Sequence, residues 1–336
     1  MVTDTGPAAQ PPPVSRPPAP GDRPPVVLAV DIGGTKAAVR ARGDGADSGV
    51  LKVRWNPGAT PDDDLAQLAA AAARALRAAG ADRPSSAVVA LPATLDADGR
   101  ISRWPGRASW RGRRPAAELA ALWGRSIAVH DDALLAGYAE ARARPRFAGG
   151  LLYLGLGTGV GGAWLPPQSA AAPPPRLGDL LPCEAGHLVV RPDDGRPCDC
   201  GRRGCLQAYA SGPALERAAA ADGRPAALAE AADACALAVA DIGELLPFTA
   251  VVLGGGLGAG SAGLAAALGG RLRHRTRHGS TLPEVTTAAH GAGASLQGAL
   301  LLAESRAVAG RPPLRPQAGP VPRGAGRRLT EGDPTA

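Results

Sequence analysis

Three cysteines and one histidine in this chain have the types and spacing of a metal site. Cys198, Cys200 and Cys205 lie within one short stretch, and His187 stands a short loop upstream. One imidazole and three thiolates are a usual tetrahedral shell for structural zinc. Nearby glycines suit the sharp backbone turns that such a clamp requires. The stretch therefore predicts a zinc loop with these four ligands.

Disulfide bonds or free buried thiols are the alternative interpretations of the cysteines. No apolar signal segment is visible at the N-terminus, which favours a cytoplasmic, reducing localisation and disfavours disulfides. The remaining cysteines, Cys183 and Cys235, lack metal-ligand spacing. They are interpreted as ordinary core residues.

Two polar side chains flank the predicted zinc loop. Glu184 stands three residues before His187, and Gln207 stands two residues after Cys205. A zinc ion bound here would fix the positions of both hydrogen-bonding groups. This arrangement suits a polyhydroxylated ligand.

A glycine-rich turn follows a predicted strand near the N-terminus. The valine-rich run at residues 26–30 leads directly into the sequence DIGGTK. Adjacent glycines let the backbone approach a phosphate, Thr35 and Lys36 add a hydroxyl and a cation, and Asp31 can reach a magnesium ion. The spacing differs from that of a Walker A loop, and a plain β-hairpin turn is the alternative, although a hairpin can also bind phosphate. The candidate residues are Asp31, Gly33, Gly34, Thr35 and Lys36.

Two further predicted strands lead into glycine turns. Residues 150–156 precede GTGVGG, and residues 248–253 precede GGGLG. One glycine-rich stretch is weak support for nucleotide binding, but a repeat of strand, glycine turn and threonine indicates two duplicated halves that grip one nucleotide. The candidate residues are Gly157, Thr158 and Gly159 for phosphate, and Gly254, Gly255 and Gly256 for adenine or ribose.

Two adjacent aspartates stand at the end of another predicted strand. Residues 127–129 read as the strand, and a predicted helix at 133–143 follows Asp131 and Asp132. Open α/β sheets bind ligands where a strand ends and a helix begins. An aspartate there can accept the proton of a substrate hydroxyl. Capping of the helix by either aspartate is the alternative interpretation.

The elements that position these residues follow from the apolar pattern. The 336-residue chain is long enough for two domains. With 45% hydrophobic but only 3% aromatic residues, its core must be filled by Ala, Leu and Val. Further helices are expected at 62–79, 211–221, 226–246 and 291–308, and further strands at 87–91 and 285–287.

Charge and hydropathy narrow the classes of partner. The formal net charge is +7, but several arginines lie after Gly310 and are interpreted as a solvated tail, with no nucleic-acid partner expected. No apolar run approaches the length of a bilayer, so no membrane partner is expected. The proline-rich residues 1–25 read as a disordered leader, which leaves no room for a helix-turn-helix domain before the first strand.

Taken in order, these motifs resemble those of the ROK family (repressors, open reading frames and sugar kinases) of the actin-like ATPase superfamily. The matching sequences are DIGGTK at 31–36, GTGVGG at 157–162, EAGH at 184–187 and CDCGRRGC at 198–205. The resemblance covers roughly residues 26–308. It implies an α/β fold of two actin-like (ribonuclease H-like) domains around a deep cleft, with a structural zinc loop.

The resemblance also implies a division of the chain. An N-terminal domain at residues 26–130, joined by the C-terminal helix 291–308, would precede a C-terminal domain at 131–290 that contains the zinc loop. Residues 1–25 and 310–336 are expected to be disordered. Members of the family are often homodimers, so the resemblance makes a homodimer one option for this chain, whose sequence does not itself reveal the oligomeric state.

Roles for individual residues follow from the same resemblance. Asp132 matches the catalytic base of the family, and Glu140 matches a glutamate that is usual in the helix after it. Glu184 and His187 match sugar contacts, with His187 also on zinc. The three glycine turns match the ATP cradle, so ATP, Mg²⁺ and structural Zn²⁺ are the expected cofactors.

The departures from the family pattern lie on the sugar side. Asp131 and Leu134 stand where the family has asparagines, Gln207 stands where it has a glutamate, and the asparagine of the rim loop has no match near Trp110. We therefore expect a working kinase that phosphorylates the primary hydroxyl of a hexose-like polyol, either a C7-cyclitol of the valiolone type, from antibiotic biosynthesis, or glucose. The expected substrate-binding residues are Asp131, Asp132, Glu184, His187 and Gln207.

Two other classes of protein carry the same motifs. A sugar-responsive ROK regulator needs a DNA-binding domain ahead of the core and often loses the ATP-site motif, whereas this chain has a proline-rich leader and an intact motif. A catalytically inactive sugar-binding protein is compatible with the sugar-side departures, and the fold alone does not exclude it.

Overall fold

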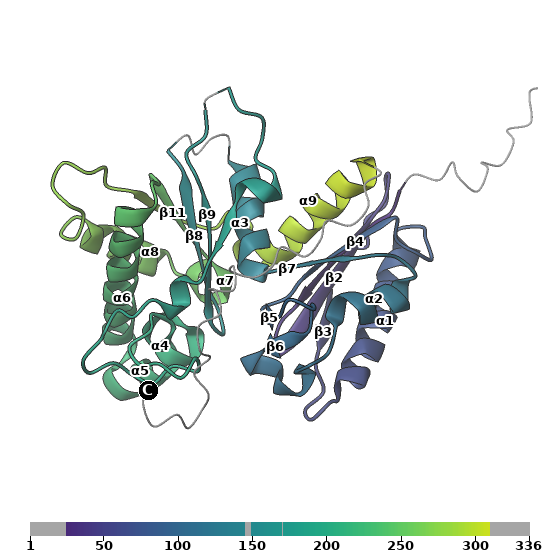
Figure 1. Ribbon diagram of the computed structural model, residues 1–336, viewed down its shortest axis with the longest axis horizontal. Helices are drawn as coiled ribbons and strands as arrows, with labels where there is room; N and C mark the ends of the chain where they lie inside the picture. The colour runs from purple at the N-terminus through teal and green to yellow at the C-terminus, as the bar shows by residue number, and fades with distance from the viewer. Residues whose placement is uncertain (1–24, 145–148, 170, 310–336) are drawn as a thin grey trace, which may run out of the picture.

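The computed structural model describes residues 25–144, 149–169 and 171–309. The predicted leader, except for Pro25, and the predicted tail lie outside the described residues. Two five-stranded sheets with helices on their faces form the described part of the chain (Figure 1).

The first sheet has the strand order β3-β2-β1-β4-β7. β1 and β2 form an antiparallel hairpin and β3 continues antiparallel, whereas β4 and β7 run parallel to β1. The central strands β1 and β4 are almost entirely buried, as expected for apolar runs covered on both faces. The bounds are β1 (Val27–Ile32), β2 (Lys36–Arg42), β3 (Leu51–Arg54), β4 (Ser86–Ala90) and β7 (Ala128–His130).

The second sheet repeats the topology of the first. Its order is β10-β9-β8-β11-β12, with an antiparallel β8–β9 hairpin, an antiparallel β10, and β11 and β12 parallel to β8. The hairpin turns after β1 and after β8 are thus equivalent positions, in agreement with the predicted duplication. The bounds are β8 (Leu151–Leu156), β9 (Val160–Leu165), β10 (Leu181–Cys183), β11 (Ala250–Gly254) and β12 (Glu284–Thr287).

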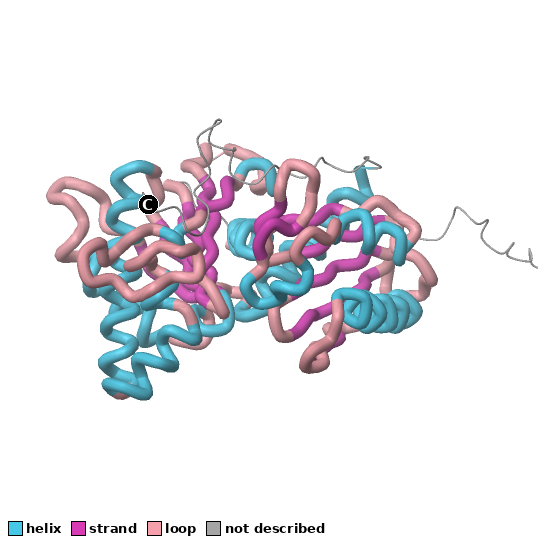
Figure 2. The backbone as a smooth tube through the Cα atoms, turned by 60° about the horizontal axis from the view of Figure 1, so that its bottom comes forward, coloured by secondary structure: helices cyan, strands magenta, loops and turns pink. Residues whose placement is uncertain are grey.

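Helices cover the faces of both sheets. Figure 1 shows α1 and α2 on the outer side of the first sheet, α6 and α8 on the outer side of the second, and α3 and α9 between the sheets. In Figure 2 the strands of each sheet are flanked by helices. The bounds are α1 (Pro61–Ala78), α2 (Pro115–Trp123), α3 (Asp132–Ala143), α4 (Gln207–Ala210), α5 (Gly212–Asp222), α6 (Arg224–Leu245), α7 (Gly255–Gly258), α8 (Ala262–Leu272) and α9 (Ala294–Ala309).

The first helix begins at strong start signals in its sequence. The Thr60 hydroxyl accepts from the backbone N–H of Asp63 at 3.2 Å, and the Asp63 carboxylate accepts from the N–H of Thr60 at 2.9 Å. This reciprocal capping box satisfies two N–H groups that the helix leaves unpaired. A third acid of the region, Asp64, is fully buried and therefore needs partners from elsewhere in the fold.

The stretch at residues 93–110 is more ordered than the sequence indicates. It contains the short hairpin β5 (Thr94–Leu95) and β6 (Ile101–Arg103) and the 3₁₀ turn η1 (Pro105–Trp110). Trp104 is 4% exposed and Trp110 is fully buried. The burial of both tryptophans distinguishes this segment from a plain surface loop. The other 3₁₀ turns are η2 (Leu177–Asp179), η3 (Ala185–His187) and η4 (Gly291–Gly293).

The last helix, α9, returns to the first sheet. It packs against β1, β4 and α3, and its Leu296 and Leu300 share a buried cluster with Val27 and Ala29 of β1. The helix that the sequence predicts from Gly291 is a 3₁₀ turn followed by α9.

Helix α3 is held closely on two sides. A Cβ atom on Gly298 of α9 would lie 1.9 Å from the carbonyl oxygen of Leu135 in α3, and one on Gly161 of β9 would lie 2.7 Å from the Cβ of Ala133. Interiors packed this tightly do not accept extra atoms without backbone shifts. The N-terminal end of α3, which begins at Asp132, is therefore fixed between α9 and the second sheet.

Replacing Gly298 by Ala is expected to lower the free energy of unfolding by about 1–3 kcal/mol, because the new methyl group must push α9 away from α3. The matched control is Gly270→Ala in α8, where a Cβ meets no atom within 4 Å; that change is expected to be neutral or stabilising by up to ~1 kcal/mol. Urea unfolding followed by circular dichroism compares the two. Equal stabilities would contradict the close helix crossing.

Candidate active site

The two adjacent aspartates have different positions at the start of α3, which separates the helix-capping role from the catalytic role. Asp131 is the N-cap of α3, and its Oδ1 accepts from the backbone N–H of Leu134 at 2.8 Å. Asp132 is the first residue of the helix and accepts from the neighbouring N–H of Ala133 at 2.9 Å. The capping interpretation therefore holds for Asp131, and Asp132 keeps acceptor capacity for a ligand.

Carboxyl groups from both halves of the chain meet around Asp132. Burial, and then the charges of Asp31 and Glu184, raise the pKa of Asp132. Burial, and then Asp132 and Glu184, raise the pKa of Asp131. Burial raises the pKa of Asp31 to about 6, although Lys36 opposes the rise. The four carboxyls thus interact electrostatically, and a cation bound beside them would stabilise their ionised forms.

The first glycine turn is closed by backbone bonds and covered by a second loop. The N–H of Gly33 donates to the carbonyl of Lys36 at 2.8 Å, and the indole N–H of Trp55 donates to the carbonyl of Gly33 at 2.8 Å. A Cβ on Gly34 would lie 3.1 Å from the Cα of Gly106. Glycine at 34 therefore allows the η1 segment to lie directly against the turn.

The sequence did not predict a buried network of polar side chains that lies behind this turn. Asp64 accepts from the indole N–H of Trp110 at 2.8 Å and pairs with the guanidinium of Arg107, which also lies 5.1 Å over the ring of Trp55. The network connects α1, η1 and the first glycine turn. Its members are far apart in the chain, and the only local signal was an acid in the first turn of α1, which reads as an ordinary helix-dipole partner.

The second and third glycine turns lie side by side at the end of β8. The N–H of Gly157 donates to the carbonyl of Gly159 at 2.9 Å, which closes the second turn. In the third turn, Gly255 has φ +74° and a Cβ there would lie 2.4 Å from the carbonyl oxygen of Leu156. Only glycine fits this position, so the third turn is held against the strand that carries the second.

The four predicted metal ligands come together. The donor atoms of His187, Cys198, Cys200 and Cys205 all lie within 4.8 Å of one another. The Nδ1 of His187 is 3.6 Å from the Sγ of Cys198, and the Sγ atoms of Cys200 and Cys205 are 3.6 Å apart. Tetrahedral zinc with Zn–S of about 2.3 Å and Zn–N of about 2.0–2.1 Å sets ligand atoms about 3.6–3.8 Å apart. The geometry therefore fits zinc.

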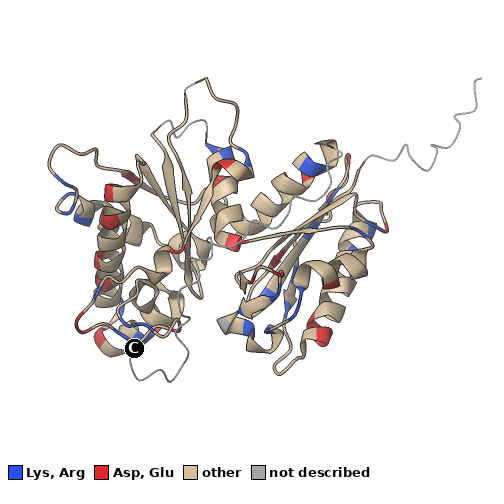
Figure 3. Cartoon of the chain, viewed as in Figure 1, with Lys and Arg blue, Asp and Glu red and all other residues tan. Residues whose placement is uncertain are grey.

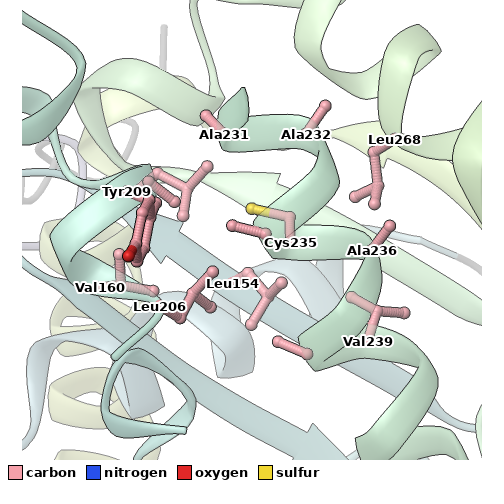
Figure 4. Close-up of a cluster of buried hydrophobic side chains, with 14 of the residues drawn as sticks. Leu154, Val160, Leu206, Tyr209, Ala231, Ala232, Cys235, Ala236, Val239 and Leu268 are labelled. Atoms are coloured by element: carbon pink, nitrogen blue, oxygen red, sulfur yellow. The ribbon is translucent and has the colours of Figure 1, made fainter. Parts of the chain in front are cut away.

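The other two cysteines lie outside the metal cluster. Cys235 is fully buried in α6, among apolar side chains that include Leu154 and Val239 (Figure 4). Cys183 is only half-buried at the end of β10 and packs against this core from its edge. The core interpretation is therefore right for Cys235, and Cys183 belongs to the rim.

The two polar residues beside the metal loop differ in their contacts. Glu184 is exposed, and its charge contributes to the raised pKa of both Asp131 and Asp132. Gln207 turns its amide nitrogen toward the Sγ of Cys198 at 3.4 Å.

Glu140 has a structural position. It is fully buried, and its two carboxylate oxygens accept from the backbone N–H groups of Ala289 and His290 at 2.8 and 2.9 Å. It thus ties α3 to the segment that leads into α9.

Comparison with known proteins places this arrangement in a family. The profile of the ROK family matches residues 27–306. This chain belongs to the ROK family. Kanosamine kinase of Amycolatopsis mediterranei is 37% identical over 300 residues, which cover 83% of this ROK chain and 96% of that relative.

Solved ROK structures share the fold as well as the sequence. A ROK hexokinase from Thermus thermophilus has a TM-score of 0.67 and 28% identity, and covers 84% of this chain and 99% of its own. A ROK glucokinase from Streptomyces griseus, solved with glucose and AMPPNP, has a TM-score of 0.64 and 26% identity, and covers 83% and 99%. The α/β class with two actin-like halves is confirmed, and the ROK chain is a sugar kinase that acts on a small molecule.

The surface adds two observations. Among the described residues, no helix combines the length and hydropathy needed to cross a membrane. Lys and Arg residues are distributed over both halves of the ROK chain in the view of Figure 3.

Proposed function

We propose that this ROK kinase transfers the γ-phosphate of ATP to the primary hydroxyl of a hexose that carries an amino group. The observation that carries the proposal is the position of Asp132. It begins α3 within electrostatic reach of both Asp31, beside the first glycine turn, and Glu184, beside the metal loop. A base at this point lies between the groups assigned to phosphate and those assigned to the acceptor.

In the proposed reaction, Asp132 accepts the proton of the primary hydroxyl while the hydroxyl oxygen attacks the γ-phosphorus in line with the departing ADP. The raised pKa of Asp132 suits this role, because a base works best when its pKa lies near the operating pH. Lys36 and the backbone N–H groups of the glycine turns bind the phosphate oxygens. Asp31 would hold Mg²⁺, which neutralises phosphate charge when it is bound.

In this proposal, residues of the metal loop bind the acceptor. His187 with the three cysteines would hold Zn²⁺, which supplies a structural cross-link. Because the Nδ1 of His187 faces Cys198, its Nε2–H is left to donate to an acceptor hydroxyl. Glu184 and Asp131 supply the neighbouring carboxyl groups.

Two observations favour an amine-bearing acceptor over glucose or a C7-cyclitol. Asp131, Asp132 and Glu184 interact electrostatically, and an ammonium group beside them would favour their ionised forms and pair with them. The similarity to a kanosamine kinase extends over most of both chains, and kanosamine is an aminohexose.

An acceptor panel tests the proposal. Zinc-loaded protein with ATP and Mg²⁺ is assayed by ADP release and product mass against kanosamine, glucosamine, glucose and a valiolone-type cyclitol. The highest kcat/KM is expected for kanosamine. A preference for a neutral acceptor would overturn the amine assignment, and turnover of none of the four would overturn the assignment of a hexose-like acceptor.

A further inference from the structure

Trp55 holds the first glycine turn through two hydrogen bonds. Its indole N–H donates to the carbonyl of Gly33 at 2.8 Å, and its backbone N–H donates to the carbonyl of Thr35 at 3.2 Å. Trp55 directly follows β3, the strand that pairs with β2, and it is buried. One residue from outside the β1–β2 hairpin therefore contacts the turn at two of its carbonyls.

The bond from the indole fixes the direction of one peptide group. In a planar trans peptide the carbonyl and the following N–H point in opposite directions, and the described part of the chain contains no cis peptide bond. The N–H of Gly34 therefore points away from the indole of Trp55. Because glycine has more backbone conformations open to it than other residues, the peptide between Gly33 and Gly34 would rotate more easily without this bond.

The indole is itself held by a buried ion pair. The guanidinium of Arg107 lies 5.1 Å over the ring of Trp55 and pairs with the carboxylate of Asp64. Asp64 is fully buried and also accepts from the indole N–H of Trp110 at 2.8 Å. A cation over an indole is attracted by the electrons of the ring. The position of Trp55 thus depends on a guanidinium that a buried carboxylate keeps in place.

Apolar packing is the alternative explanation for Trp55. The side chain belongs to the buried cluster of the first half, together with Ile32 and Val39, and a phenyl ring would fill much of the same space. Packing does not account for an indole N–H that donates to a carbonyl of the turn, since phenylalanine has no such donor. The two explanations can therefore be separated by removing the N–H and keeping an aromatic ring.

We propose that Trp55 is a positioning residue for the nucleotide: its indole orients the peptide between Gly33 and Gly34 so that the N–H of Gly34 donates to a phosphate oxygen. A donor oriented in advance needs no rearrangement when the phosphate arrives. The pair of Arg107 and Asp64 acts through the indole. The phosphate half of this inference rests on the proposed function, whereas the hold on the turn rests on the bonds of Trp55 alone.

The first test compares Trp55→Phe with Trp164→Phe. Trp164 makes the same kind of bond elsewhere, because its indole N–H donates to the carbonyl of Pro247 at 3.0 Å. It pairs with Leu152 near the start of β8, at the end of that strand away from its glycine turn. Calorimetry without acceptor measures the Kd for AMPPNP. Trp55→Phe is expected to raise this Kd by about 2–10-fold, and Trp164→Phe is expected to leave it unchanged.

Deuterium uptake without nucleotide tests the hold on the turn directly. Peptides that span residues 31–37 should exchange faster in Trp55→Phe than in the wild type, because the turn opens more often. Peptides from the second half should exchange as in the wild type, which separates a local effect from a general loss of stability. Trp164→Phe should leave the uptake of residues 31–37 unchanged. Wild-type uptake of this segment in Trp55→Phe would overturn the hold on the turn.

A second variant covers a failure of Trp55→Phe to fold. Arg107→Lys keeps the charge that Asp64 requires but loses the planar group over the indole, so it should also raise the Kd for AMPPNP. Combining it with Trp55→Phe should cost less binding free energy than the sum of the two single effects, because both act on one peptide. Wild-type AMPPNP affinity in both single variants would overturn the positioning role, and additive effects would overturn the action of Arg107 through Trp55.

The wild type separates this inference from the proposed function. If wild-type protein failed to bind AMPPNP, the proposed function and the phosphate half of the inference would both fall. The deuterium uptake would still decide whether Trp55 holds the turn. If the wild type binds AMPPNP and Trp55→Phe binds it equally well, the proposed function stands and the positioning role falls.

Discussion

Asp132→Asn is expected to lower kcat by about 10²–10⁴-fold, the usual contribution of a positioned general base. The amide keeps the size and shape of the side chain but cannot accept the proton of the attacking hydroxyl. Because Asp132 is the first residue of α3 and not its N-cap, the helix should remain intact. Steady-state kinetics measure the loss, and calorimetry with AMPPNP should show that nucleotide still binds.

A matched control and a pH profile complete this test. Asp44→Asn removes the same charge at an exposed position and should leave kcat unchanged. In the wild type the base must be ionised, so kcat/KM should fall as the pH drops through a value well above the ordinary aspartate pKa of about 4. This fall in kcat/KM reports an apparent pKa of the coupled pair Asp131 and Asp132, and not the pKa of one residue. Near-wild-type turnover by Asp132→Asn would rule out the assignment.

Asp131→Asn is expected to reduce the preference for an amine-bearing acceptor over glucose by about 10–100-fold in the ratio of kcat/KM values. A hydrogen bond to a charged group contributes about 1.5–3 kcal/mol, and the substitution removes the charge that the ammonium would meet. Asparagine caps helices as well as aspartate does, so the bond to Leu134 should be kept. A ratio that stays unchanged would show that Asp131 is only a cap.

Asp131→Asn should also change how the stability of the folded protein depends on pH. The pKa of Asp131 is raised by burial and by Asp132, so the folded state holds this proton more tightly than the unfolded state does. Stability is therefore lost as the pH rises above the ordinary aspartate value of about 4. Without ligands, Asp131→Asn should melt at a higher temperature than the wild type at pH 8, and the difference should shrink toward pH 4.

The parts of the site that lie within one short stretch were predictable from the sequence. The strand and glycine turn at Gly33 and the metal cluster at Cys198 depend on local chain geometry, which spacing reports directly. The partners of Asp64 were not predictable, because Arg107 and Trp110 reach it only after the chain has folded. The need for glycine at 298 was also not predictable from the sequence, because it comes from the close approach of the α3 backbone.

The contact of α9 with β1 also has a consequence for synthesis. The strand nearest the start of the described chain packs one face against the helix at its end, where Val27 and Ala29 meet Leu296 and Leu300. During synthesis, this face of the first sheet therefore stays uncovered until α9 has been made. Exposed apolar surface of this kind promotes aggregation. The newly made first sheet is therefore protected from aggregation only when α9 packs on it or while a chaperone binds it.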